Sequence, residues 1–272
     1  MIPEEEFAAK RTEAEQLIRQ HAPQRLQEQL ISLLRPAIAL TATRTEDARI
    51  EVGASKFGGA PDVPAAFEWP TSAWNNEPLL FLAQINLEEV APLDVQKELP
   101  STGLLSFFYG IEEGPCENLH QVFWFNEQPL HRIGSPTTPV VETCIMSFAV
   151  DVDRGDAFEE LEWEDFQLLL ESEKSEPDYV AAQAVHPVPS LLKLLGHPDP
   201  VFGGIHVSRW DQYNNLIEPE PQKGDYQLLL QVDSDDTLDV MWCDNGLLYF
   251  LIRKEDLAAQ RFDRVHVETA WG

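Results

Sequence analysis

The chain has 272 residues, with 47 Asp and Glu against 19 Lys and Arg, and a formal net charge of −28 at pH 7. A field this negative repels nucleic-acid phosphates and anionic lipid and attracts cationic partners, so nucleic-acid and membrane binding are disfavoured. The first residues, MIPEEEFAAKR, are acidic where an export signal is basic and then apolar, so we expect a soluble, cytoplasmic protein. Three widely spaced cysteines fit reduced thiols better than disulfides or a zinc site.

The N-terminal part of the chain reads as helical. Apolar residues recur at helical spacing over residues 4–35, in two successive stripes. Pro23 suits the first turn of a second helix, and Pro36 would stop that helix. We therefore expect residues 1–36 to form a helical hairpin that packs on the rest of the protein.

From Ile38 onward, short apolar runs alternate with Gly, Pro and Asn, a pattern typical of strands and turns. The predicted strands are 38–43, 79–86, 103–109, 121–126, 140–150, 226–233, 238–243 and 247–252. Helical spacing predicts inserted helices at 159–172, 189–195 and 254–260. The sequence thus predicts an α+β, mainly β fold with an N-terminal helical hairpin and a few inserted helices.

Three sequence landmarks occur twice and in the same order. They are a Gly-x-Pro turn (59–61 and 196–198), a Leu-rich strand with a glutamine (79–85 and 228–232) and a strand that starts with Gly-Leu-Leu (103–108 and 246–250). Such order indicates a duplication with loop insertions. We expect residues 37–272 to form one pseudo-symmetric domain of two β-roll or sheet units, about 37–150 and 180–272, joined by an acidic helical segment at 151–179.

These landmarks resemble a known family. The motifs are Gly58-Gly59-x-Pro61-x-x-Pro64, Trp69-Pro70, Leu79-x-Phe81-Leu82-Ala83-Gln84-Ile85, Gly103-x-Leu105-x-Phe107-Phe108, Gly196-His197-Pro198, Leu229-Leu230-Gln231-Val232-Asp233 and Trp242-x-Asp244-x-Gly246. Over roughly residues 38–272 the chain is similar to the YwqG-like family of bacterial domains of unknown function. The resemblance implies a mainly β, duplicated roll-like fold, no established reaction, and an inhibitor role, because some members are associated with toxin and immunity gene clusters. His197 and Cys243 depart from the glycines common in the family.

Gln84 and Gln231 each interrupt an apolar strand at matching positions, and a buried amide is costly unless its hydrogen bonds are satisfied. In one interpretation each glutamine bonds backbone groups of its own Gly-Pro loop. In the other, both face a ligand cleft between the repeats. The residues proposed for that cleft are Trp69, Trp74, Gln84, His197, Gln231, Trp242, Cys243 and Asp244.

Two further constellations point to chemistry only weakly. Cys243 with His197 invites a thiol nucleophile, but a cysteine at the end of a strand is more often a small hydrophobic residue. Asp233, Asp235 and Asp244 have a spacing similar to a calcium loop, but Leu238 stands where that loop needs glycine, and a hairpin is the simpler account. We therefore assign no catalytic residue, metal or cofactor.

The segment 151–178 contains twelve carboxylates and two basic residues. It reads either as a solvated helix face or as a docking surface for a basic protein, centred on Glu159, Glu160, Glu162 and Glu164. The favoured function is a non-catalytic binding module with an acidic surface, of the toxin-neutralising kind. The alternative is a small-molecule-binding protein or enzyme that uses the cleft between the repeats.

Overall fold

The computed structural model describes residues 2–72, 75–110, 120–126, 129–137, 139, 141–153, 192–199, 225–242 and 245–270. Its helices are α1 (Pro3–His21), α2 (Gln27–Leu33), α3 (Leu87–Val90) and α7 (Lys254–Ala258), with short 3-10 helices η1 (Asp47–Arg49) and η2 (Phe262–Arg264). Its strands are β1 (Arg35–Arg44), β2 (Lys56–Phe57), β3 (Asp62–Pro64), β4 (Leu80–Asn86), β5 (Leu104–Tyr109), β6 (His120–Phe125), β7 (Leu130–Arg132), β8 (Cys144–Asp153), β9 (Leu192–Leu195), β10 (Tyr226–Asp233), β11 (Leu247–Arg253) and β12 (His266–Ala270). The predicted α+β, mainly β class is confirmed.

Ten strands form one antiparallel sheet in the order β12-β11-β10-β9-β1-β8-β2-β4-β5-β6, and β3 pairs with β7 separately. The order is symmetric about the central β1–β8 pair, because four strands of the second repeat follow β1 and four strands of the first repeat follow β8. The predicted duplication is therefore visible directly in the topology.

The repeats exchange their central strands. In chain order, β1 begins one set of strands (β1, β2, β4, β5 and β6) and β8 begins the other (β8 to β12), but β1 pairs with β9 of the second set, where Ala39 lies opposite Lys193. β8 pairs in the equivalent way with β2, where Ile145 lies opposite Lys56. Each unit thus completes its sheet with a strand from the other, which explains why the two units form one pseudo-symmetric domain.

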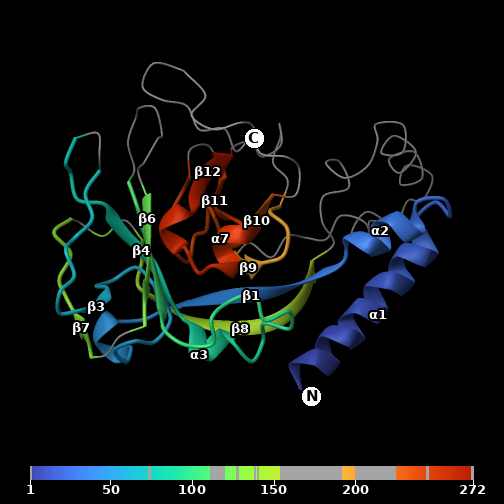
Figure 1. Cartoon of the computed structure of the whole chain (residues 1–272), viewed down its shortest axis with the longest axis horizontal. Coiled ribbons are helices and arrows are strands. Elements are labelled where there is room, and N and C mark those ends of the chain that lie inside the picture. Colours follow the sequence, from blue (N-terminus) through green and yellow to red (C-terminus); the bar gives the residue numbers. More distant parts are fainter. Residues whose placement is uncertain are drawn as a thin grey trace.

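The sheet curls into a nearly closed, barrel-like shape whose interior is the main hydrophobic core (Figure 1). Inside it, the rings of Phe107 and Phe250 meet at 5.0 Å. Near the closure, the Tyr109 hydroxyl lies 3.2 Å from Thr269 Oγ1. This curvature brings the two outer ends of the strand order close together.

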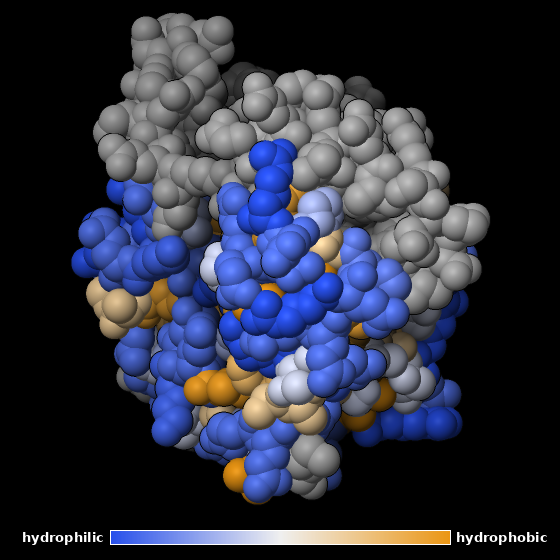
Figure 2. Space-filling view, turned by 90° about the vertical axis from the view of Figure 1, so that its right-hand side faces the viewer, coloured by the Kyte–Doolittle hydropathy of each residue, from blue (hydrophilic) through white to orange (hydrophobic). Residues whose placement is uncertain are grey.

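The predicted N-terminal hairpin is confirmed as α1 and α2, whose apolar residues pack together against Val152 of β8. Lys10 Nζ ties α1 to β8 by donating to the Val150 carbonyl at 2.6 Å. Pro23 lies in the turn before α2, and Pro36 lies within β1. The face on this side of the molecule is largely hydrophilic, with small separate hydrophobic areas (Figure 2). No described helix is long and apolar enough to cross a membrane.

Two element predictions are wrong. The predicted helix at 189–195 is instead a strand where it is described, because β9 lies between β1 and β10 and is buried on both faces. A short apolar run such as Leu-Leu-Lys-Leu-Leu has no period that separates a helix from a buried strand. The predicted strand at 238–243 is a loop over its described residues, 238–242, with a bridge between Asp235 and Val240. Its apolar residues mark burial in the core rather than strand pairing, since Leu238 and Trp242 are both buried.

The predicted helix at 254–260 is confirmed as α7. The predicted helix at 159–172 lies outside the described residues. The remaining strand predictions are confirmed with small shifts of their ends, the largest at β8, which begins at Cys144 rather than at 140.

Candidate functional site

The first repeat contains a buried polar cluster built around Gln84. The Gln84 Oε1 accepts from the Asp62 N–H at 2.9 Å, and its Nε2 donates to Asp62 Oδ2 at 2.7 Å and to the Ala54 carbonyl at 2.8 Å. Lys56 lies directly opposite Gln84 in the sheet and donates to Asp47 Oδ1 at 2.8 Å. Lys56, Asp62 and Gln84 are completely buried.

The second repeat contains the same cluster. Gln231 Oε1 accepts from the Asp199 N–H at 2.8 Å, and its Nε2 donates to Asp199 Oδ2 at 2.5 Å. Lys193 lies opposite Gln231 and donates to Asp199 Oδ1 at 2.6 Å and to Asp153 Oδ2 at 2.7 Å. In both repeats a lysine, two carboxylates and a glutamine thus hold the Gly-Pro loop against the sheet, as the first interpretation of the glutamines predicted.

Two glycines make room for these carboxylates. Gly59 and Gly196 have φ angles of 71° and 76°, in the left-handed region that favours glycine. A Cβ atom at Gly59 would lie 2.5 Å from Asp47 Oδ1, and one at Gly196 would lie 2.6 Å from Asp153 Oδ2. The glycine of each Gly-x-Pro turn is therefore required, because a carboxylate lies too close to the turn for a side chain there.

The two clusters differ in charge. In the first, Arg132 Nε donates to Asp62 Oδ1 at 2.8 Å, which gives two cations for two carboxylates. In the second, the Tyr249 hydroxyl donates to the Asp199 carbonyl at 2.7 Å, and the cation that the described residues place against Asp153 and Asp199 is Lys193.

This difference appears in the titration of the paired aspartates. Burial alone raises the pKa of Asp62, but hydrogen bonds from Arg132, Gly53 and Gln84 and the charge of Lys56 outweigh it, so the pKa lies below its usual value. Burial also raises the pKa of Asp199, and Lys193 and Gln231 do not fully compensate, so that pKa lies above its usual value. Burial also lowers the pKa of Lys56.

Both clusters are closed internally. Their lysine and glutamine side chains are buried, and the hydrogen bonds above join these groups to one another and to the loop backbone. A buried ion pair of this kind is destabilising to break, because one charge is left without its partner. The geometry therefore gives the glutamines and lysines a structural role.

The other predicted cleft residues lie in separate environments. Trp69 belongs to an aromatic cluster with Phe67, Phe81 and Phe108, and its Nε1 donates to the Leu79 carbonyl at 2.8 Å. Trp242 is buried in the main core, with its ring 5.7 Å from that of Tyr109. Trp74, Cys243 and Asp244 lie outside the described residues, as do Glu159, Glu160, Glu162 and Glu164 of the acidic segment.

His197 packs toward the N-terminal hairpin, where its Nε2 lies 2.8 Å from the Leu33 carbonyl. Burial lowers the pKa of His197, although Asp153 opposes this effect. The structure thus does not bring His197, Trp69 and Trp242 together around one hollow.

Of the predicted thiol and carboxylate groups, Cys243 and Asp244 lie outside the described residues, and Cys144 was not part of the prediction. Cys144 is buried, and burial raises the pKa of its thiol, which disfavours the nucleophilic thiolate. Asp235 Oδ1 accepts from the Thr237 and Leu238 N–H groups at 2.7 and 3.0 Å, as in a tight turn. Burial raises the pKa of Asp233 to about 6. Within the described residues, no group of three or more potential metal ligands occurs.

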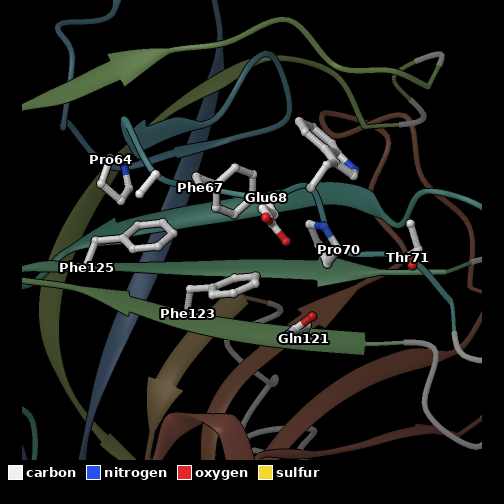
Figure 3. Close-up of a pocket in the computed structure, with 10 residues that line it drawn as sticks. Pro64, Phe67, Glu68, Pro70, Thr71, Gln121, Phe123 and Phe125 are labelled. Carbon is white, nitrogen blue, oxygen red and sulfur yellow. The ribbon is translucent and has the colours of Figure 1, made fainter.

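An open pocket lies on the outer face of the first repeat, between the loop after β3 and strand β6 (Figure 3). Its volume is about 590 Å³. It is lined by Pro64, Ala66, Phe67, Glu68, Trp69, Pro70, Thr71, Gln121, Phe123 and Phe125. The lining is therefore mainly aromatic and proline-rich, with one ionisable group.

The rings of this pocket contact one another directly. Phe123 and Phe125, two positions apart on β6, have nearly parallel rings with centroids 5.5 Å apart. Phe67 meets them edge to face at 5.4 and 5.8 Å, and it also stacks on Phe108. Figure 3 shows the Glu68 carboxylate among these rings, and Glu68 and Gln121 are exposed.

Of the candidate cleft residues predicted from the sequence, Trp69 alone is among the ten that line this pocket. The alternation Gln121, Phe123, Phe125 in a predicted strand was the available signal, because residues two apart share one face of a strand. The lysines of the two clusters were also missed, although Lys56 and Lys193 each stand six residues before the paired aspartate.

Fold and sites together define a duplicated, mainly β protein with two closed polar clusters and an open aromatic pocket. The chain belongs to the family described as a domain of unknown function, DUF1963, whose sequence model matches residues 55–270. A search of curated proteins found no match.

Proposed function

We propose that this protein is a non-catalytic binding module of the bacterial cytoplasm that engages a basic protein, in the manner of a toxin-neutralising protein. The YwqG-like resemblance supports this class. The observation that carries the proposal is the contrast between the two kinds of site in the described structure. The buried ionisable clusters are closed by their own partners, whereas the open pocket presents aromatic rings and a carboxylate to solvent.

Composition and pocket chemistry support the same partner. A formal charge of −28 attracts a basic protein over long range and raises the association rate. Aromatic side chains are enriched at protein interfaces because they offer a large, stiff contact area. An acidic surface with an aromatic pocket therefore suits a basic protein better than a nucleic acid or an anionic substrate.

The volume of the pocket favours a second candidate, a small-molecule-binding protein. Pockets for small ligands commonly measure about 300–1,000 Å³, and this pocket lies within that range. This candidate needs a ligand that stabilises the protein in the absence of any macromolecular partner.

The test is capture of partners from a bacterial lysate on the immobilised protein at low and high salt, followed by reconstitution with the purified candidate. We expect a basic protein whose binding in the purified system weakens as salt rises. Stabilisation by a small ligand, with no basic protein that binds after purification, would favour the second candidate. Captured proteins that are acidic or insensitive to salt would contradict the proposed function.

A further inference from the structure

We infer that the aromatic pocket between residues 64–71 and β6 receives an arginine side chain of a basic partner protein. The guanidinium lies against the rings of Phe123 and Phe125 and pairs with Glu68. This inference rests on the proposed function, because it names the group of the basic partner that the module recognises.

Comparison of the two repeats shows that the fold does not need aromatic residues at this place. In the first repeat, Ser106 lies opposite Phe123 and Leu104 opposite Phe125; in the second, the equivalent Tyr249 lies opposite Glu268 and Leu247 opposite Ala270. The duplicated sheet thus carries Glu268 and Ala270 where the first repeat has two phenylalanines. The aromatic pair is a property of one repeat rather than of the architecture.

The equivalent edge of the second repeat also has different chemistry. There His266 Nε2 lies 2.8 Å from Glu268 Oε1, and the His266 ring contacts Tyr226. That edge satisfies its carboxylate internally. In the first repeat, Glu68 has no basic partner among the described residues, and its carboxylate is exposed at the pocket.

The electrostatics of the pocket select a cation. The faces of aromatic rings carry partial negative charge and attract a cation that lies within about 6 Å of the ring centre. None of the ten lining residues is basic, and Glu68 contributes a full negative charge. An anionic ligand would meet both the carboxylate and the −28 charge of the chain.

The shape of the pocket favours arginine over lysine. A guanidinium is planar, so it can stack on a phenylalanine ring while it donates two parallel hydrogen bonds to a carboxylate. The nearly parallel rings of Phe123 and Phe125 offer such a surface beside Glu68. A lysine ammonium would pair with Glu68 as a point charge and use the rings less fully.

The first experiment measures calorimetric binding of the peptide acetyl-Gly-Arg-Gly-amide and of its citrulline counterpart, which keeps the shape and removes the charge. We expect the arginine peptide to bind at least about tenfold more tightly, since a cation–π contact and a charge-assisted bond are both lost with citrulline. The inference is overturned if the two peptides bind equally tightly or if neither peptide binds.

Two carboxylate variants then separate the pocket from the general field. Glu68→Gln and Glu77→Gln each remove one negative charge, and both residues are exposed in the same segment, but only Glu68 lines the pocket. We expect Glu68→Gln to weaken binding of the arginine peptide by about tenfold, and Glu77→Gln to leave it within about twofold of wild type. Equal effects of both variants would show that binding depends on net charge, and would overturn the assignment of the arginine to the pocket.

The aromatic contribution is tested by Phe125→Ala, which copies the residue at the equivalent position of the second repeat. We expect binding of the arginine peptide to fall by about fivefold or more, with an unchanged circular dichroism spectrum. Full retention of binding in the folded variant would overturn the stacking arrangement.

The same variants distinguish this inference from the proposed function. If a purified basic partner binds wild type and Glu68→Gln with equal affinity at every salt concentration, the pocket assignment fails and the proposed function stands. If the arginine peptide binds at the pocket but no basic protein binds the chain, the pocket assignment stands and the proposed function fails.

Discussion

Phe107 and Phe250 occupy equivalent positions in the two repeats, and their rings contact each other edge to face at 5.0 Å inside the barrel-like sheet. Equivalent residues of two related units can meet only near the pseudo-twofold axis that relates the units. This contact therefore marks the axis and joins the two halves of the core.

We expect Phe107→Leu and Phe250→Leu each to reduce the free energy of unfolding by about 1–2 kcal/mol, because both side chains are fully buried. The double variant should lose less than the sum, by about 0.5–1.5 kcal/mol, since the ring contact can be lost only once. Chemical denaturation of wild type, the two single variants and the double variant gives the interaction free energy between the two rings. Strict additivity would show that the rings do not couple the two halves.

We expect Gln84→Leu and Gln231→Leu each to lower stability by about 1–3 kcal/mol, because Leu leaves the loop N–H of Asp62 or Asp199 unpaired in the interior. Gln16→Leu, on the exposed surface of α1, is the control and should change stability by less than about 0.5 kcal/mol. Denaturant midpoints for Gln84→Leu and Gln231→Leu equal to that of the wild type would rule out the loop-locking role.

We expect Gly59→Ala and Gly196→Ala to destabilise the fold by at least about 1–2 kcal/mol each, because a Cβ atom would meet a carboxylate at a positive φ. Gly134→Ala is the matched control, since a Cβ atom there has no neighbour within 4 Å. It should be neutral or stabilising by at most about 1 kcal/mol. Thermal unfolding of the three variants measures their relative stability. Similar melting temperatures for all three would contradict the prediction.

The same substitution in the two clusters should have opposite pH dependence. The pKa of Asp62 is lowered in the folded state, so its stabilising contribution is present above the unfolded value of 3.8 and is lost as pH falls through the lower folded pKa. The pKa of Asp199 is raised, so its contribution is full below 3.8 and is lost as pH rises through the folded pKa. Unfolding free energies measured from pH 3 to pH 8 in wild type, Asp62→Asn and Asp199→Asn test these signs.

At neutral pH we expect Asp62→Asn to cost on the order of 3–5 kcal/mol, because among the described residues it leaves the two cations Lys56 and Arg132 with one partly exposed carboxylate, Asp47. Its cost should shrink in acid. Asp199→Asn should cost less at neutral pH, and its cost should grow toward acid. Parallel pH profiles for the two variants would show that the charge difference between the clusters has no energetic effect.

For the acidic segment, we expect Gln at Glu159, Glu160, Glu162 and Glu164 to leave stability nearly unchanged, because a run of like charges that the sequence predicts to be solvated contributes little. Association with a basic partner should slow, most clearly at low salt, since attraction beyond about 8 Å is screened at physiological ionic strength. Stopped-flow or surface-based kinetics across a salt series measure this. Unaltered association rates would leave the segment as a solubility feature.

The sequence by itself determined the mainly β class, most of the longer strands, the N-terminal hairpin and the duplication. These features depend on local patterns: apolar runs of strand length, helical spacing in α1 and α2, and glycine at turns such as Gly59 and Gly196 that require a positive φ. Matching positions of Gln84 and Gln231 even indicated how the two Gly-Pro loops are held. Such signals can be read from a single sequence, because each depends on the backbone conformation of a few neighbouring residues.

Only the tertiary structure decided the exchange of β1 and β8 between the repeats, the pairing of Lys56 and Lys193 with their aspartates, and the pocket around Phe123. β2 has two residues and β9 has four, so neither carries a readable period, and each becomes a strand only through its neighbours in the sheet. Tertiary structure also places Trp69, His197 and Trp242 in separate environments, although the sequence suggested one cleft. Sheet register and curvature determine which distant side chains meet, and these depend on contacts between residues far apart in the chain.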